Sequence, residues 1–268
     1  MRIHFHKYQA TGNDFVLIDN RSVKKSFSEE EIKKVCDRRF GVGADGLILL
    51  EHADEGDFNM VYYNSDGTQS LCGNGCRSAV EFASSLGLID KNTSFNAFDG
   101  LHQASILENG TVRLKMNDVS GIKKLNDAYF MDTGSPHYVR FVKELDKFNV
   151  VDDGRKVRNS DMFMPGGTNA NFVELLPDNT IAVRTYERGV EDETLSCGTG
   201  VTAAAIAASL SGYSSPVMIK VKGGNLAVEF KAGPPDTGLA ADGNISATFV
   251  DIFLIGPAKM VFEGDLEL

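Results

Sequence analysis

The sequence predicts an α+β protein of two pseudo-symmetric domains from internal duplication, each a mainly antiparallel, barrel-like sheet around a central helix. Cys-Gly-x-Gly occurs twice, at residues 72–75 and 197–200, and each copy precedes an alanine-rich segment that favours a helix. The two copies lie about half of the 268-residue chain apart. Each also follows a Tyr and a polar residue, and precedes segments in which apolar and polar residues alternate.

The first half opens with two predicted strands, residues 3–8 and 15–19, which are rich in aromatic and β-branched residues and flank a polar turn. Ser28 followed by three glutamates predicts a helix start, because a cap residue and first-turn acids stabilise that end. Cys36 lies on the apolar stripe of this helix, which predicts a core position. Strands are then predicted at residues 47–50, 58–63, 95–107 and 111–116, with a helix from Cys72 to near Gly87 and a hairpin turn at Asn109-Gly110.

The second half repeats this order from about residue 118. An Asn followed by Phe-Val opens a strand in both halves, at residues 13–16 and 169–173. Residues 128–132 and 137–142 are predicted as strands or as a strand entering a short helix, and 181–186, 217–230 and 244–255 as strands. Residues 157–168 are loop-rich, and 152–153 and 233–236 are predicted as solvent-facing loops. We therefore predict an N-terminal domain of residues 1–117 with a tail of about 257–268, and a C-terminal domain of residues 118–256. A site is expected in the cleft between them.

Composition narrows the class of protein. A hydrophobic content of 42% and a charged content of 24% are ordinary for a globular protein. The net charge of −10 and a pI near 5.0 argue against a general partner for nucleic acid or anionic membranes. The N-terminus carries no signal-peptide core and no apolar stretch is long enough to span a bilayer, so a cytoplasmic location with reduced cysteines is expected.

Each cysteine motif predicts a thiol just before a helix N-terminus, where unpaired N–H groups and the helix dipole stabilise a thiolate and can hold a carboxylate. Zinc is disfavoured at Cys72 and Cys76, since no second Cys/His pair completes four ligands, and the Cys-x-x-Cys spacing of redox pairs is absent. A cysteine hydrolase using His137 as base would leave the second motif unexplained. Proton transfer at a carbon next to a carboxylate uses both thiols, one as base and one as acid, and needs neither metal nor cofactor.

A series of motifs then resembles the diaminopimelate epimerase family over essentially the whole chain. The motifs are Gly12-Asn13-Asp14-Phe15, Asn64-x-Asp66-Gly67, Cys72-Gly73-Asn74-Gly75, Pro136-His137, Asn169-x-Asn171-Phe172, Glu187-Arg188-Gly189 and Glu193-Thr194-x-x-Cys197-Gly198-Thr199-Gly200. The resemblance implies a cofactor-independent, cytosolic homodimer of lysine and cell-wall precursor synthesis. It would convert LL- into meso-2,6-diaminopimelate.

The resemblance also implies roles for single residues. Cys72 and Cys197 would be the catalytic acid/base pair, and His137 with Glu187 would tune their protonation. Backbone groups of the two loops would hold the reacting carboxylate, and polar side chains would read the rest of the substrate. The loop residues are Gly73, Asn74, Gly198 and Thr199; the substrate-reading residues are Asn13, Asn64, Asn169, Glu187 and Arg188.

Two positions depart from the commonest family pattern, and two other functions compete. Ser135 stands where many members carry Asn before Pro-His, and Gly46 stands where many carry Gln. The first alternative is a proline or hydroxyproline racemase of the same fold, whose first motif usually has His where Asn74 stands. The second is a non-catalytic amino-acid-binding or redox-sensing protein.

Overall fold

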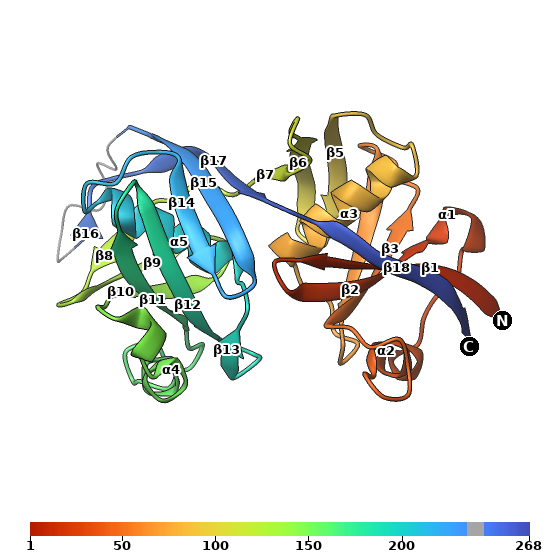
Figure 1. Ribbon diagram of the computed structural model, residues 1–268, viewed down its shortest axis with the longest axis horizontal. Helices are drawn as coiled ribbons and strands as arrows, with labels where there is room; N and C mark the ends of the chain where they lie inside the picture. Colours follow the sequence, from red (N-terminus) through yellow and green to blue (C-terminus); the bar gives the residue numbers. More distant parts are fainter. Residues whose placement is uncertain (235–243) are drawn as a thin grey trace. The chain divides into compact units, whose positions relative to one another are not determined.

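The computed structural model describes residues 1–234 and 244–268 (Figure 1). These residues form two compact units: unit 1 consists of residues 1–114 and 256–268, and unit 2 of residues 115–255. Both units are rich in strands and contain few helices, which confirms the predicted α+β class. The boundaries given above were predicted for domains that fold separately, and they stay a prediction. The predicted loop at 233–236 falls partly outside the described residues.

Unit 1 is a sheet that carries helix α3 against its strands (Figure 1). Its strands pair in the order β18-β1-β2-β3-β4-β5-β6-β7; β2–β3 and β4–β5 are parallel and the other pairs are antiparallel. The elements are β1 (Arg2–Ala10), β2 (Asn13–Asp19), α1 (Asn20–Val23), α2 (Glu29–Cys36), β3 (Gly46–Glu51), β4 (Phe58–Asn64), α3 (Gly73–Ser85), β5 (Asn92–Ala97), β6 (Gly100–Ile106), β7 (Val112–Lys115) and β18 (Lys259–Glu267).

Unit 2 repeats this plan around helix α5 (Figure 1). Its strands pair in the order β16-β8-β9-β10-β11-β12-β14-β15-β17, and β13 adds a short antiparallel pair to β12. The elements are β8 (Ile122–Lys124), β9 (Ala128–Asp132), β10 (Pro136–Phe141), η1 (Leu145–Lys147), α4 (Val150–Arg158), β11 (Asn169–Leu176), β12 (Thr180–Glu187), β13 (Asp192–Thr194), α5 (Gly198–Ser209), β14 (Val217–Val221), β15 (Gly224–Ala232), β16 (Asn244–Ile245) and β17 (Phe249–Gly256).

The pairing pattern is the same in both units and identifies equivalent strands. From β1 to β6 the successive pairs run antiparallel, parallel, antiparallel, parallel and antiparallel, and β9, β10, β11, β12, β14 and β15 repeat that series. Strand β2 therefore corresponds to β10, and β3 to β11. The parallel that the sequence suggested between residues 13–16 and 169–173 is wrong, because Asn13 opens β2 whereas Asn169 opens β11. The residue equivalent to Asn169 is Gly46 at the start of β3, and Asn13 is equivalent to Ser135.

Both central helices are largely buried, and small residues make this possible in α5. Helix α5 buries residues all round its circumference, including the run from Gly200 to Ala208, as expected for a helix that is apolar on every face. Alanine side chains let the surrounding strands approach the helix closely. Helix α3 is less uniform, since it buries the polar Arg77 and Ser78 together with Cys76 and Phe82.

Local signals explain which predicted elements are correct. Ser28 forms a capping box with Glu31, and Cys36 packs in the core of unit 1, where burial raises its pKa to about 11. The predicted strand region at 95–107 contains parts of two strands, because a turn divides it between β5 and β6. The loop predicted at 152–153 is also wrong, because Asn149 caps α4 and the two aspartates occupy its first turn.

Candidate functional site

Both cysteines of the repeated motif lie at the N-cap of a central helix, as predicted. Cys72 has extended backbone angles of φ −133° and ψ 109° before α3, and Cys197 has φ −125° and ψ 113° before α5. Neither side chain makes a capping hydrogen bond to its helix, so the first-turn N–H groups are not capped by the thiols. These groups are a local source of positive potential for a thiolate or a bound carboxylate.

In unit 1 an amide oxygen faces the thiol. The Cys72 thiol donates to Asn13 Oδ1 at 3.5 Å, and Asn74 Nδ2 donates to the same oxygen at 3.2 Å. Asn13 Nδ2 donates to Asp45 Oδ2 at 2.6 Å. Because a carboxylate only accepts hydrogen bonds, Asp45 fixes the orientation of the Asn13 amide and keeps its oxygen toward Cys72.

A buried arginine completes this network. Arg77 lies on α3 with its side chain fully buried, and its Nη2 donates to Asn74 Oδ1 at 2.9 Å and to Thr11 Oγ1 at 3.2 Å. Within the described residues no carboxylate lies at ion-pair distance from Arg77, and burial lowers its pKa to about 10, while ionisation of Cys72 or Cys76 acts in the opposite direction. Arg77 fixes the Asn74 amide and places a cation behind the first cysteine loop.

In unit 2 a histidine and a hydroxyl lie near the motif cysteine. His137 Nε2 lies 2.9 Å from Thr199 Oγ1, which lies 3.6 Å from Cys197 Sγ. On the other side of the ring, Asn171 Nδ2 lies 3.0 Å from His137 Nδ1. The Asn171 amide is itself fixed, since Nδ2 also donates to Tyr138 O at 2.9 Å and Oδ1 accepts from Thr185 at 2.9 Å.

This network determines the tautomer of the histidine. Because Asn171 donates to Nδ1, the proton of a neutral His137 is on Nε2 and is donated to Thr199 Oγ1. The Thr199 hydroxyl keeps its own proton and can donate it to Cys197 Sγ. Burial, followed by the charge of Arg188, lowers the pKa of His137 to about 3, so the ring is neutral at physiological pH. His137 thus reaches Cys197 through Thr199, whereas Cys72 faces an acceptor.

The predicted substrate-reading residues of unit 2 form a second network. Asn169 Nδ2 donates to Ser135 Oγ at 2.7 Å and to Pro136 O at 3.0 Å, and its Oδ1 accepts from the backbone N–H of Arg188 at 2.8 Å. The Arg188 guanidinium donates to Gly166 O at 3.2 Å. No carboxylate of the described residues pairs with Arg188, so this half-buried cation retains capacity for an anion.

The remaining predicted residues lie at strand and helix ends. Asn64 ends β4, and its amide donates to Thr68 Oγ1 at 3.0 Å and to Ser70 Oγ at 3.1 Å, which closes the turn before the first cysteine loop. Glu187 ends β12. Gly73 and Gly198 are the first residues of α3 and α5.

Three site residues escaped prediction from sequence: Asp45, Arg77 and Asn171. Asn171 belongs to a quoted motif, so its role could have been inferred from it. Arg77 stands five positions after Cys72 in an apolar helix, which is an unusual place for a charge. Nothing in the sequence marked Asp45 as a site residue, because its contact with Asn13 depends on the pairing of β2 with β3.

The two departures from the family pattern have local structural consequences. Ser135 is bound by Asn169, as described above. At Gly46 a Cβ atom would lie 2.4 Å from Tyr62 Cε2 and 2.5 Å from Tyr63 O, so a larger residue requires Tyr62 to move.

Other cysteines and metal ligands lie outside these networks. Cys76 is fully buried in α3, and burial raises its pKa. All four cysteines lie within the described residues and none forms a disulfide. Over residues 1–234 and 244–268, one group of side chains is spaced to hold a metal ion, and it contains neither motif cysteine: His4, His6 and Glu263. In the same residues no helix is long and apolar enough to cross a membrane.

Comparison with known proteins relates the chain to one enzyme family. The family model described as diaminopimelate epimerase matches residues 5–122 and 129–240. The diaminopimelate epimerase of Flavobacterium psychrophilum is 48% identical over 262 residues, covering 96% of this chain and 98% of that protein. That of Chlorobaculum tepidum is 40% identical over 268 residues, with 96% and 98% covered. A phenazine biosynthesis protein of the PhzF family from Bacillus anthracis matches with a TM-score of 0.72 at 15% identity, covering 100% of both chains, and shows the fold alone.

Proposed function

The chain belongs to the diaminopimelate epimerase family, and from this premise we propose that it interconverts LL- and meso-2,6-diaminopimelate without a cofactor. It is therefore an isomerase. The observation that carries the proposal is 48% identity over nearly the full length of a protein of that name. The two cysteine loops, each at the N-terminus of a buried helix, support it independently.

The proposed chemistry is inversion by two thiols. One cysteine, as thiolate, removes the α-proton of the substrate, and the electron pair stays on the α-carbon and spreads into the adjacent carboxylate. The other cysteine, as thiol, gives its proton to the opposite face. Atoms and charge balance, because Cys72 and Cys197 exchange protonation states in each turnover. This use of an acid and a base on opposite faces requires both motifs.

We assign the reacting carboxylate to the backbone N–H groups of the two loops. Gly73 and Asn74 open α3, and Gly198 and Thr199 open α5, so their N–H groups lie in the first helical turns. Such groups bind anions and stabilise the charge that develops on the carboxylate when the α-proton leaves.

The far end of the substrate is assigned to polar side chains near β11 and β12. Arg188 supplies a planar guanidinium for the distal carboxylate, and Asn169 positions it by accepting from its backbone N–H. Glu187 suits the distal ammonium group. Asn13 and Asn64 complete the proposed set of substrate-reading residues.

The hydrogen bonds also favour one resting protonation state. Cys72 faces the oxygen of Asn13, which cannot donate, so we assign it as the thiol. Cys197 faces the Thr199 hydroxyl, which accepts from His137 and can donate its own proton to the sulfur, so we assign Cys197 as the thiolate. His137 would tune Cys197 through Thr199, and Glu187 would contribute to the tuning of the pair.

We also propose a metabolic role and an oligomeric state for the protein. The reaction would serve lysine and cell-wall precursor synthesis in the cytoplasm, a compartment that keeps thiols reduced. A homodimer is supported by three consecutive exposed apolar residues on β18: Met260, Val261 and Phe262. Sedimentation velocity tests this proposal: a dimer that dissociates in Val261→Asp supports it, and a monomeric wild-type chain contradicts it.

The function is tested by incubating the reduced protein with LL-diaminopimelate and separating the isomers by chiral chromatography. We expect meso product without added cofactor, and a loss of at least about 100-fold in kcat for Cys72→Ala and Cys197→Ala. Cys36→Ala is the matched control, since this thiol lies in the core of unit 1. Conversion of L-proline instead would move the assignment to the racemase alternative. Substrate binding without conversion would indicate a binding protein.

A further inference from the structure

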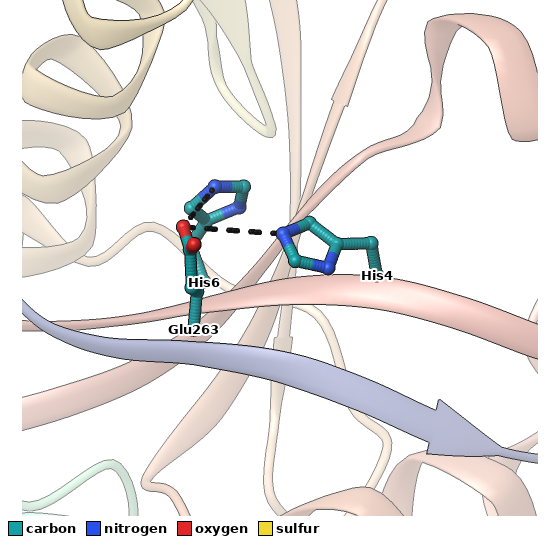
Figure 2. A group of neighbouring side chains, drawn as sticks. All are labelled: His4, His6 and Glu263. Carbon is teal, nitrogen blue, oxygen red and sulfur yellow. Dashed lines mark ion pairs between the residues drawn. The ribbon is translucent and has the colours of Figure 1, made fainter.

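Three metal-binding side chains meet on the paired strands β1 and β18, outside the cysteine loops (Figure 2). His4 and His6 are two residues apart on β1 and so project from the same face of the strand. Glu263 is the direct partner of His6 across the strand pair. In Figure 2 dashed lines join the Glu263 carboxylate to one nitrogen of each imidazole ring.

The spacing fits one tetrahedral ion. His6 Nε2 lies 3.4 Å from Glu263 Oε2, His4 Nε2 lies 4.0 Å from the same oxygen, and all three ligand atoms lie within 4.8 Å of one another. Zinc bonded at about 2.0–2.1 Å holds tetrahedral ligand atoms about 3.3 Å apart. The side chains of His4 and Glu263 are 52% and 55% exposed, so rotation about their side-chain bonds can close the remaining gap.

One ligand is already held in place. The His6 side chain is 17% exposed, and its ring packs against Phe82 with ring centroids 4.8 Å apart. Its Nδ1 is buried and has no hydrogen-bond partner within the described part of the chain, so Nε2 is the nitrogen that faces the other two ligands. A fixed ligand reduces the conformational entropy lost on binding.

A second carboxylate orients His4. His4 Nδ1 lies 3.1 Å from Asp265 Oδ1, and Arg2 Nη2 donates to the other oxygen of Asp265 at 2.6 Å. A histidine whose Nδ1–H is donated to a carboxylate presents Nε2 as the metal ligand, an arrangement common at zinc sites. Nothing in the substrate-binding proposal uses these residues.

We propose that His4, His6 and Glu263 bind one Zn²⁺ ion per chain, with water as fourth ligand and Asp265 orienting His4. Two imidazoles and one carboxylate suit zinc rather than Mg²⁺ or Ca²⁺, which prefer oxygen ligands. The ion would cross-link β1 to β18, the strands that hold the two ends of the chain together. This site differs from the one disfavoured on sequence, which was Cys72 and Cys76 without a second Cys/His pair, because it uses no cysteine.

Calorimetric titration of the chelator-treated full chain with Zn²⁺ alone tests the proposal. It is performed in a Cys72→Ser/Cys197→Ser background, so that these thiols do not contribute. We expect one ion per chain, with affinity at least about tenfold lower in His6→Ala, Glu263→Gln and Asp265→Asn. His102→Ala is the matched control, because this histidine pairs with Asp99 on another part of unit 1.

Two further readouts separate this site from others. Zn²⁺ should raise the melting temperature of the wild-type chain but not of Glu263→Gln, a conservative change at an exposed position. Bound Co²⁺ should lack the thiolate charge-transfer bands that cysteine ligands produce. Zinc affinity unchanged in all three site variants, or absence of binding in the cysteine-substituted background with its site intact, would overturn the proposal.

Discussion

The Thr199 hydroxyl connects His137 to the Cys197 thiol. Replacement by valine keeps the shape of the side chain and removes this connection. Hydrogen bonds to charged groups contribute about 1.5–3 kcal/mol, so we expect kcat of Thr199→Val to fall about 10- to 100-fold. The acid limb of the pH–rate profile should also move to higher pH, because the thiolate loses a donor. Thr199→Ser should retain both the rate and the profile; a valine variant with an unchanged profile would contradict this role.

His137 makes stability depend on pH. Its pKa falls from 6.5 to about 3 on folding, chiefly through burial. Above pH 6.5 the ring is neutral in both states, and the folded state is not penalised. As pH falls from 6.5 toward 3, the unfolded chain takes up a proton that the folded chain does not, and stability is lost.

We therefore expect the unfolding free energy of the wild type to decline over this range more steeply than that of His137→Gln. The difference in slope should approach about 1.4 kcal/mol per pH unit. Urea titrations at several pH values measure it. Equal slopes for the two chains would show that His137 titrates normally in the folded protein.

The two central helices begin alike but tolerate different changes. A Cβ atom on Gly75 would lie 3.3–3.4 Å from its neighbours, whereas one on Gly200 would lie 2.5 Å from Asn171 Oδ1. Helical Gly→Ala changes normally stabilise by about 0.5–1 kcal/mol. Gly75→Ala should therefore stay within about 1 kcal/mol of the wild type.

Gly200→Ala should instead lose about 1–3 kcal/mol, through overpacking. It should also lose activity, because Asn171 holds His137. Thermal unfolding and kcat measured on the pair of variants test the contrast. Equal effects of the two substitutions would contradict it.

Elements with strong local signals were predictable from the sequence, and those set by tertiary pairing were not. Ser28 and the three glutamates after it predicted α2, and the Cys-Gly-x-Gly motifs predicted α3 and α5. Helix α4 also had signals, an Asn149 cap and basic residues in its last turn, but Gly154 weakened its helical pattern. The equivalence of β2 with β10 could not be read from sequence, because Asn13 and Asn169 look alike although they open non-equivalent strands.

The site was predictable to a similar extent. Motif residues that the sequence singled out do contact one another, Asn13 with Cys72 and Asn74 in unit 1 and His137 with Thr199 in unit 2, and their roles stay predictions. Contacts through other elements, such as that of Asp45 with Asn13, depend on strand register, which a single sequence does not determine.

At the scale of the whole molecule, the last strand belongs to the first unit. β18 pairs with β1 from Arg2 with Glu267 to Gln9 with Lys259. Deleting residues 257–268 would leave β1 as an edge strand paired only with β2, and remove Phe262 from the ring of Phe5.

Hydrogen exchange should then show lost amide protection in unit 1 and retained protection in unit 2. The full-length chain is the control. Unchanged protection in unit 1 would show that β18 is not required for its fold.

The central claim is that Cys72 and Cys197 act on opposite faces of one carbon, and initial-rate epimerisation in heavy water tests it most directly. With two monoprotic bases, deuterium should enter the α-position of the meso product, whereas recovered LL-substrate should keep its hydrogen at early times. Cys72→Ala and Cys197→Ala should each abolish inversion. Equal deuterium in recovered substrate and product, or inversion that persists in either variant, would contradict the two-thiol mechanism.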